Sequence, residues 1–444
     1  MADDKIRIKK GLDIPLAGKP SNEVTIDTAS RLFAVCPDDF PGITWKALVK
    51  PEDKVTAGDP IFTDKTTGKI FLVSPVSGVV KEVNRGERRH INFISVEKTS
   101  DAQPSPVEKI SDDAAGIKEA LFRSGLWAMM RQRPYDIVPD IETEPRDIFV
   151  TAFDSAPLAG DIIRDEDKDW LEKGLESLAK LTPGKVYLDI RAGQGLTSKA
   201  AVVTEFEGPH PAGNVGPQIA AIKPVNKGET VWTLDAMTAV RIGKLCAGGI
   251  YDLTTLVAVT GPMIENPHLV KASVGASIEG LLKGMLSSEH DIRIISGNVL
   301  TGIKVTKDGF LRYPYRQVTV IEEGENADEF MGWASMNPGK YSVKHTFPAF
   351  LRGLTKPFNF DARIKGGRRA MILSGEYDKV FPFDIYPEYL LKAIMANDID
   401  RMEKLGIYEV APEDFALPEF VDTSKQELQK TVREGLDYLR KELS

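Results

Sequence analysis

Residues 124–135 read Ser-Gly-Leu-Trp-Ala-Met-Met-Arg-Gln-Arg-Pro-Tyr. A loop that wraps a phosphate needs glycine, because backbone amides must approach the phosphate closely and some residues take positive φ. After Gly125 this stretch has no glycine, and large side chains such as Trp127 and Met130 occupy its middle. An apolar stripe of this kind, following a helix, is most often core packing. The stretch is therefore either ordinary core or a nucleotide loop that bulky side chains have filled.

The same stretch resembles a region of the flavoprotein subunit of respiratory complex I and of the C subunit of the Rnf electron-transport complex. In those proteins a Ser-Gly-Leu or similar start runs into a glycine-rich loop that wraps the flavin phosphate. Where that loop has glycines, this chain has Trp127, Met129, Met130, Arg131 and Gln132, and its loop is slightly shorter. The resemblance implies a relative of a nucleotide site that has lost its nucleotide.

Length and composition indicate a soluble protein of several domains. A chain of 444 residues is too long for a single hydrophobic core. Its 42% hydrophobic and 27% charged residues are ordinary for a globular protein. No apolar run approaches the roughly 18 residues that cross a bilayer, and the N-terminus has no signal-peptide pattern. We therefore expect a cytoplasmic protein, unless a partner holds it at a membrane.

Charge and cysteine usage exclude several classes of function. A net charge of −8 argues against nucleic acid as a partner, because nucleic acid selects basic faces. Only two cysteines occur, Cys36 and Cys246, so a disulfide framework, a four-cysteine metal site and a four-thiolate [4Fe–4S] cluster are excluded. No two histidines have ligand spacing, and no P-loop or nucleophile elbow occurs. We expect no bound metal and no hydrolase or kinase activity.

The first hundred residues contain two strand-rich segments, 49–62 and 74–83, that resemble the barrel-sandwich fold of biotinyl and lipoyl carrier domains. Gly58 and Gly78 suit the turns of that fold. Lys65 stands where a carrier would present its modified lysine, but the segment after it is longer than in carriers and makes its own turn. We therefore predict a scaffold domain without a covalent cofactor.

Farther along, a buried strand over 147–153, a helix over 170–181 and a second buried strand over 185–190 predict a parallel sheet of Rossmann type. Ser111 and the two aspartates after it are typical of a helix start. This unit is the part related by resemblance to the complex I flavoprotein subunit. We expect it to lack a nucleotide site.

The second half of the chain predicts two more units. Residues 257–302 look like a β-grasp domain of the SLBB type, in which Ser277 caps a helix over 278–286. From Pro387 onward the spacing of apolar residues is helical. The expected division of this multidomain α/β chain is a barrel-sandwich domain over 1–105, a Rossmann-like domain over 106–255, a β-grasp or SLBB-like domain over 256–345 and a mostly helical domain over 346–444, with a linker at 99–106.

The turn Gly208-Pro209-His210-Pro211-Ala212-Gly213 is the second informative stretch. Two prolines fix φ and two glycines permit unusual dihedral angles, so His210 is held at the tip of a rigid turn. One interpretation is a structural turn whose histidine faces solvent. The other is contact with a ligand or proton handling, which suits a group that titrates near neutrality.

Taken in order, these motifs identify a family. The whole chain resembles the A subunit of the bacterial sodium-translocating NADH:quinone oxidoreductase, and the resemblance rests on many segments. They are 8–18, 83–86, 124–127 with 131–134, the turn at 208–213, 266–270, 275–277 and 295–302. None of these is a catalytic signature by itself, but together and in this order they are specific.

The resemblance implies a peripheral subunit, on the cytoplasmic side of the bacterial inner membrane, of a six-subunit respiratory complex. That complex carries electrons from NADH to ubiquinone and exports Na⁺. Its FMN, FAD, riboflavin and iron–sulfur centre belong to other subunits, so this chain is expected to bind no cofactor and to be inactive alone. The expected partners are the other subunits of the complex, above all the membrane-embedded B subunit, and also the C subunit. Ubiquinone is the possible substrate.

The same family is associated with the quinone, and two segments are candidates for the site: 32–40 and 131–136. An aromatic ring beside apolar walls suits a quinone head, and arginine can stabilise the reduced oxygen. The candidate quinone-binding residues are Phe33, Phe40, Arg131, Arg133, Tyr135 and His210. They are expected to meet at a cleft between the first two domains, where Tyr135→Ala should weaken binding of a quinone analogue. The alternative is a docking and assembly subunit with a vestigial nucleotide fold and no ligand.

Overall fold

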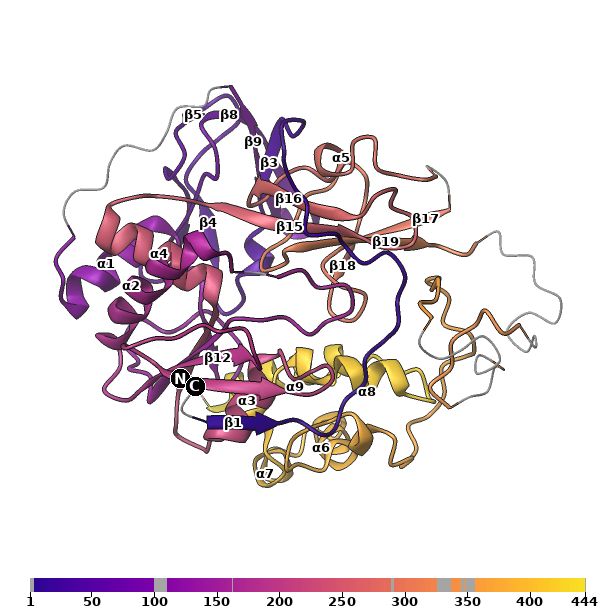
Figure 1. Ribbon diagram of the computed structural model, residues 1–444. Coiled ribbons are helices and arrows are strands. Elements are labelled where there is room, and N and C mark those ends of the chain that lie inside the picture. The colour runs from indigo at the N-terminus through magenta and orange to yellow at the C-terminus, as the bar shows by residue number, and fades with distance from the viewer. Residues whose placement is uncertain are drawn as a thin grey trace.

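The computed structural model describes residues 4–99, 110–161, 163–288, 291–325, 337–344, 348 and 356–443. The expected linker at 99–106 therefore lies almost entirely outside the described residues. Two six-stranded sheets and two smaller ones form the framework, and helices gather around one large sheet and at the C-terminal end (Figure 1). Within the part of the chain that the structure describes, no helix is long and apolar enough to span a membrane.

The barrel-sandwich domain consists of a four-stranded and a three-stranded sheet with a shared apolar core. Ile61, Phe62, Val80, Ile94 and Val96 are fully buried there. The four-stranded sheet has the order β3 (Leu32–Val35), β9 (Ile91–Lys98), β8 (Gly78–Arg85), β5 (Lys54–Val55), and the other has the order β4 (Trp45–Ala47), β6 (Pro60–Asp64), β7 (Phe71–Val73). This confirms the barrel-sandwich prediction.

The second domain is built on a mostly parallel sheet. Its order is β1 (Asp4–Arg7), β13 (Val202–Glu207), β12 (Val186–Arg191), β11 (Asp147–Thr151), β14 (Val231–Asp235) and β10 (Arg131–Arg133). Every pair is parallel except β10 with β14. Strand alternation places Ile148 and Val150 on the face covered by α2 (Lys168–Ala179) and α4 (Ala236–Gly248), and Phe149 on the face covered by α3 (Val215–Ile222). The predicted parallel sheet is confirmed.

Helices α2 and α4 approach each other closely because glycines face their crossing. A Cβ added to Gly174 would lie 1.9 Å from the carbonyl oxygen of Ala239, and one added to Gly243 would lie 2.0 Å from that of Trp170. No side chain fits in that space. Upstream, α1 (Ala114–Ser124) begins at its N-cap Asp113, which accepts a hydrogen bond from the Gly116 N–H. The helix start is where the sequence predicts it, but the cap is Asp113 and not the predicted hydroxyl of Ser111.

The third sheet belongs to the SLBB region. Its order is β18 (Ile303–Val305), β17 (Ile292–Ser296), β19 (Gln317–Glu322), β15 (Thr254–Thr260), β16 (His268–Ser273) and β2 (Val24–Ile26). Ser277 caps α5 (Ile278–Leu281) as predicted, but the helix ends well before the predicted residue 286. The cause lies in the next residues, where the chain turns and Gly284 takes a φ of +72° that is incompatible with a helix.

Residues 4–26 do not join the sandwich. Strand β1 extends the parallel sheet beside β13, and β2 forms an edge of the SLBB sheet beside β16. The strands of the sandwich run only from β3 to β9. The N-terminal segment thus forms strands of the second and the SLBB sheets, although the predicted boundary at residue 105 assigns it to the sandwich domain.

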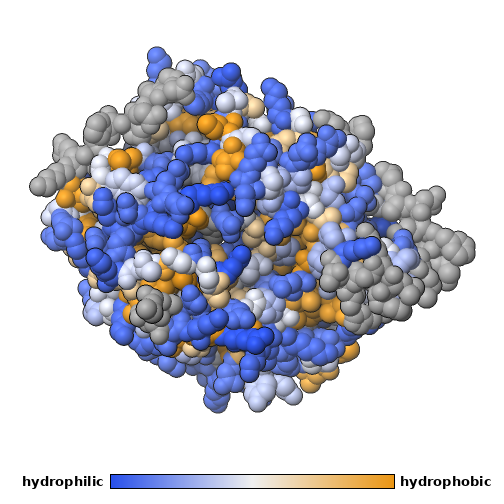
Figure 2. Space-filling model, in the orientation of Figure 1, coloured by the Kyte–Doolittle hydropathy of each residue, from blue (hydrophilic) through white to orange (hydrophobic). Residues whose placement is uncertain are grey.

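The C-terminal region is irregular from 356 to 386, apart from a single turn, and helical afterwards. Its elements are α6 (Pro387–Met395), α7 (Ile399–Lys404), the 3-10 turns η8 (Ile407–Glu409) and η9 (Pro412–Phe415), α8 (Ala416–Val421) and α9 (Leu428–Leu443). Leu390, Leu391, Val432, Leu436 and Leu439 form part of its separate core. The face of the molecule shown in Figure 2 is mostly hydrophilic, with hydrophobic residues in several separate patches.

Candidate functional site

A cavity of about 470 Å³ lies at the carboxyl edge of the parallel sheet. Strand β11 ends there at Thr151, and β14 ends there at Asp235. The chain proceeds from β11 to β12 and β13 on one side and then crosses back to place β14 on the other side of β11. Ligands of open α/β sheets bind at such a reversal of strand order, outside the carboxyl ends of the strands.

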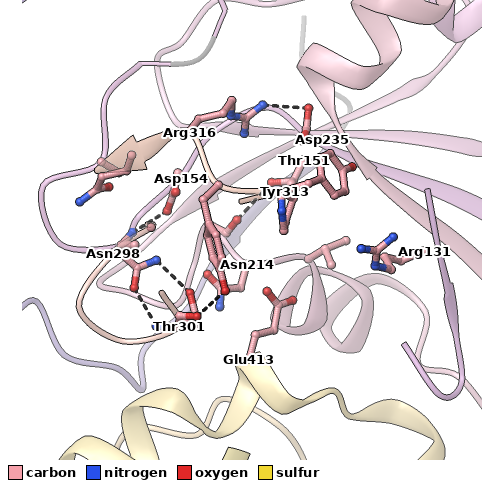
Figure 3. Close-up of a pocket in the computed structure, with 18 of the residues that line it drawn as sticks. Arg131, Thr151, Asp154, Asn214, Asp235, Asn298, Thr301, Tyr313, Arg316 and Glu413 are labelled. Atoms are coloured by element: carbon pink, nitrogen blue, oxygen red, sulfur yellow. Dashed lines mark hydrogen bonds and ion pairs between the residues drawn. The ribbon is translucent and has the colours of Figure 1, made fainter. Parts of the chain in front are cut away.

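All parts of the chain contribute to the lining (Figure 3). Asp38, Asp39 and Pro41 come from the sandwich domain. The second domain supplies the loops after β11 and β13. The SLBB region supplies Asn298, Thr301, Ile303 and the segment 313–317, and the C-terminal region supplies Pro412, Glu413 and Gln429. The cavity is therefore interdomain, a common place for a ligand site.

Arg131 lines this cavity and joins the two candidate segments. Its guanidinium donates to the carbonyl oxygen of Asp39 at 2.6 Å and lies 5.5 Å from the centre of the Tyr313 ring. Residues 131 and 39 therefore meet, as the expected convergence of segments 32–40 and 131–136 requires. The guanidinium's three hydrogen bonds within the described residues all go to backbone carbonyls, those of Asp39, Ala128 and Met130, and no carboxylate of these residues forms an ion pair with it.

Phe33 and Phe40 are both buried. Phe33 is 4% exposed and pairs with Ala276 of the SLBB region through an isolated β-bridge. Phe40 is 5% exposed and stacks on the Tyr313 ring with centroids 5.1 Å apart. Neither residue lines the large cavity, but Phe40 backs Tyr313, which does.

Arg133 and Tyr135 point to the C-terminal region. The Arg133 side chain is 1% exposed and pairs with Asp414 at 2.8 Å and with Glu413 at 3.1 Å. Tyr135 packs against the C-terminal core and takes a φ of +81°. The structure therefore brings Arg131 and His210 to the cavity, but not Phe33, Phe40, Arg133 or Tyr135.

His210 is buried, so the interpretation in which it faces solvent is wrong. It is 3% exposed and lines the cavity, and its Nδ1 lies 3.0 Å from the Ser155 hydroxyl. Its backbone N–H donates to Asp13 at 2.9 Å. Burial lowers the pKa of His210 to about 4, although Asp154 and Asp13 oppose that shift. The imidazole is therefore neutral at pH 7.

This burial predicts a pH dependence of stability. The folded state resists protonation of His210 down to about pH 4, whereas the unfolded chain takes up that proton near pH 6.5. The contribution of neutral His210 to the free energy of unfolding is thus fully present above about pH 6.5. As the pH falls from there toward 4, the free energy of unfolding decreases by about 1.4 kcal/mol per pH unit. We expect the difference in unfolding free energy between wild type and His210→Gln to follow that slope in denaturant titrations. Parallel curves for the two proteins would contradict it.

The stretch at 127–132 is filled by its own side chains. Trp127 is fully buried between Phe122 and Trp232, with ring centroids 4.7 and 4.9 Å away, and its indole N–H donates to the carbonyl oxygen of Pro139 at 2.9 Å. Met130 is fully buried too. The interpretation as core packing is therefore confirmed for these side chains.

Several lining residues escaped the sequence analysis. Asp39 pairs with Arg312 through three contacts of 2.6, 2.9 and 3.0 Å, although the pair Asp38-Asp39 has the composition of a solvated turn. Tyr313 donates its hydroxyl proton to the Met129 carbonyl at 2.5 Å, and burial raises its pKa to about 12. The run 312–316, Arg-Tyr-Pro-Tyr-Arg, was the available signal, because aromatic and arginine residues are enriched at binding sites.

The described residues include no group of three or more histidines, cysteines, aspartates or glutamates placed to hold a metal ion. A barrel-sandwich domain, an α/β domain with a mostly parallel sheet and an SLBB domain around one cavity define a multidomain α/β protein. Family models agree with that class. Residues 6–99 match the NqrA N-terminal barrel-sandwich hybrid domain, 112–251 the NqrA second alpha/beta domain and 256–307 the NQRA C-terminal domain.

Curated relatives give the particular family. The A subunit of Na(+)-translocating NADH-quinone reductase from Hahella chejuensis is 39% identical, over 98% of this chain and 100% of the relative. The same subunit from Serratia proteamaculans is 38% identical over 98% and 100%, and that from Rhodopirellula baltica is 35% identical over 98% and 98%. The chain belongs to the NqrA family, the A subunits of Na⁺-translocating NADH-quinone reductase, and it is a subunit of that oxidoreductase.

A comparison of folds adds little. A crystal structure of NAD⁺-reducing [NiFe]-hydrogenase in the H2-reduced state matches 74% of this chain and 61% of its own with 12% identity and a TM-score of 0.36.

Proposed function

We propose that this subunit takes part in the quinone step of the complex and that the quinone head enters the cavity at the carboxyl edge of the parallel sheet. The observation that carries the proposal is the lining of that cavity. An apolar wall of Leu256, Ala258 and Leu269, on the neighbouring strands β15 and β16, shares the space with Arg131 and Tyr313. A ring with two carbonyl oxygens and an isoprenoid tail needs both kinds of surface.

The polar groups suit a quinone that gains electrons. The Arg131 guanidinium remains positively charged, so it favours an oxygen on which negative charge develops. Tyr313 retains its proton, since its pKa is raised to about 12 by burial, and its ring offers a flat face beside Arg131. Of the sequence candidates, Arg131 and His210 would touch the ligand, and Phe40 would support Tyr313 from behind.

Membership of the NqrA family supports the remaining parts of the proposed role. Electrons come from NADH through flavins and an iron–sulfur centre held by other subunits, and this chain binds none of them. The purified chain should accordingly be colourless. It would dock on the cytoplasmic side of the membrane against the B subunit, with the C subunit nearby, and its second domain would descend from a nucleotide-binding fold of the complex I type. Lys65 would carry no lipoyl or biotinyl group.

A substitution in the apolar wall tests the site. Leu256 is partly exposed, on β15, and Leu256→Asn would place an amide against the ligand without disturbing the fully buried core. We expect the Kd of a soluble quinone analogue to rise about tenfold, because roughly 1.4 kcal/mol corresponds to the loss of most of one leucine's contact. The binding should be measured on the purified chain and on the complex.

Leu48→Asn is the matched control, since Leu48 is 45% exposed and does not line the cavity. That variant should bind the analogue as the wild type does. Equal affinity in all three proteins would reject the site and leave docking and assembly as the function of this subunit.

A further inference from the structure

Glu413, which the sequence analysis did not single out, stands at the edge of the cavity in an unbalanced group of charges. It belongs to η9 and points from the C-terminal region toward the cavity (Figure 3). Its carboxylate lies 3.1 Å from the Arg133 guanidinium, and its side chain is 39% exposed. Among the described residues, Glu413 and Asp414 contact Arg133 with their carboxylates, and of these two only Glu413 lines the cavity.

Arg133 has two carboxylates to neutralise. Asp414, fully buried, lies 2.8 Å from the guanidinium and also accepts a hydrogen bond from the Ala411 N–H at 2.8 Å. Asp136, after β10, and Asp154, after β11, add negative charge from the neighbouring elements. One positive charge therefore faces two direct carboxylates and two more distant ones, and two like charges this close cannot both remain ionised without cost.

The hydrogen bonds decide which carboxylate takes the proton. Among the described residues, Asp414 Oδ2 accepts two hydrogen bonds, from Arg133 and from the Ala411 N–H, while its Oδ1 has no partner. Glu413 accepts one hydrogen bond, from Arg133. Donors to the ionised form keep a carboxylate charged, so the proton belongs on Glu413. Consistent with this arrangement, burial and then the Asp414 charge raise the pKa of Glu413 to about 8.

We propose that Glu413 is the proton donor of the cavity, a neutral acid that gives its proton to an oxygen of the quinone as that quinone is reduced. This inference rests on the proposed quinone site. Reduction of a quinone to a quinol consumes two electrons, supplied by the other subunits, and two protons. Glu413 supplies one of these protons, breaking its O–H bond as the quinol O–H bond forms, and the second proton comes from solvent. The resulting carboxylate, held by Arg133, is reprotonated from solvent before the next turnover.

Glu413→Gln is the discriminating variant in the assembled complex. Glutamine retains the size of the side chain and an oxygen for Arg133 but has no proton to give. We expect the rate of quinone reduction to fall about 100-fold, the scale of a lost general acid, while the Kd of the quinone analogue stays within about twofold. The wild-type rate should decline as the pH rises through the pKa of Glu413, and the residual rate of the variant should lack that decline.

Glu176→Gln, on an exposed position of α2, should retain the full rate and the wild-type pH profile. A Glu413→Gln complex with wild-type rate and profile would overturn the proposal. If the quinone analogue does not bind in the cavity, the proposed quinone site is rejected. The protonation state of Glu413 can be tested independently of that result. The infrared difference between wild type and Glu413→Gln at pH 7 should show the carbonyl band of a protonated carboxyl group, and its absence would also overturn the inference.

Discussion

Arg133→Met should destabilise the chain by about 3–5 kcal/mol, the usual cost of leaving a buried carboxylate without its partner. The guanidinium is 1% exposed, binds Asp414 and Glu413, and also donates to the Glu409 carbonyl at 3.0 Å. Methionine matches much of its length but none of its charge. Denaturant unfolding of the C-terminal region, followed by hydrogen exchange in α9, would measure the loss.

The pH dependence identifies the cause. Without Arg133, the pKa of Asp414, already raised by burial, rises further, so the folded variant takes up a proton that the unfolded chain releases near pH 3.9. The loss of unfolding free energy in Arg133→Met is therefore largest at neutral pH and becomes smaller as the pH falls toward about 3.9. Arg123→Met provides the control, because Arg123 pairs with Glu119 on the surface at 2.6 Å with its side chain 76% exposed. That variant should keep nearly the wild-type stability. Equal losses in the two variants would contradict a buried-charge effect.

Trp127→Ala should cost about 3–5 kcal/mol, as expected for a large aromatic side chain removed from a close-packed core. The indole is fully buried between two aromatic rings, and its removal also leaves the Pro139 carbonyl without its donor. The loss should appear as a lower unfolding midpoint, with the near-ultraviolet signal of Trp232 altered in the folded state.

Two companion variants separate ring packing from other effects. Trp127→Phe retains an aromatic ring and loses only part of the contact and the hydrogen bond, so its loss should be clearly smaller. Tyr386→Ala, at a side chain 69% exposed, should change stability little. A Trp127→Ala protein as stable as the wild type would show that the 127–132 stretch is not part of the core.

Short segments of the sequence were sufficient to predict most helices and strands and the buried side chains of 127–132. The apolar segments 147–153 and 185–190 predicted buried strands, and the cap Ser277 predicted a helix start, because composition and capping are properties of a short segment. The start of α1 was predicted too, although Asp113 caps it in place of Ser111. The absence of glycine around Trp127 predicted a loop occupied by side chains for the same reason. The ordered motifs indicated the family, which the relatives confirm. Local pattern failed for α5, where Gly284 ended a helix that apolar spacing alone would have continued.

Only the tertiary structure decided where the charges and the cavity lie. Asp39 meets Arg312 across 273 residues of sequence, and Arg133 meets Asp414 across 281. Pro412-Glu413-Asp414 has the composition of an ordinary helix start, so nothing in the segment marks Glu413 as a cavity residue. The sequence by itself determined the domains' types and which side chains are apolar enough to be buried. The contact partners of a buried charge, and therefore its ionisation, depend on which distant segments the fold brings together.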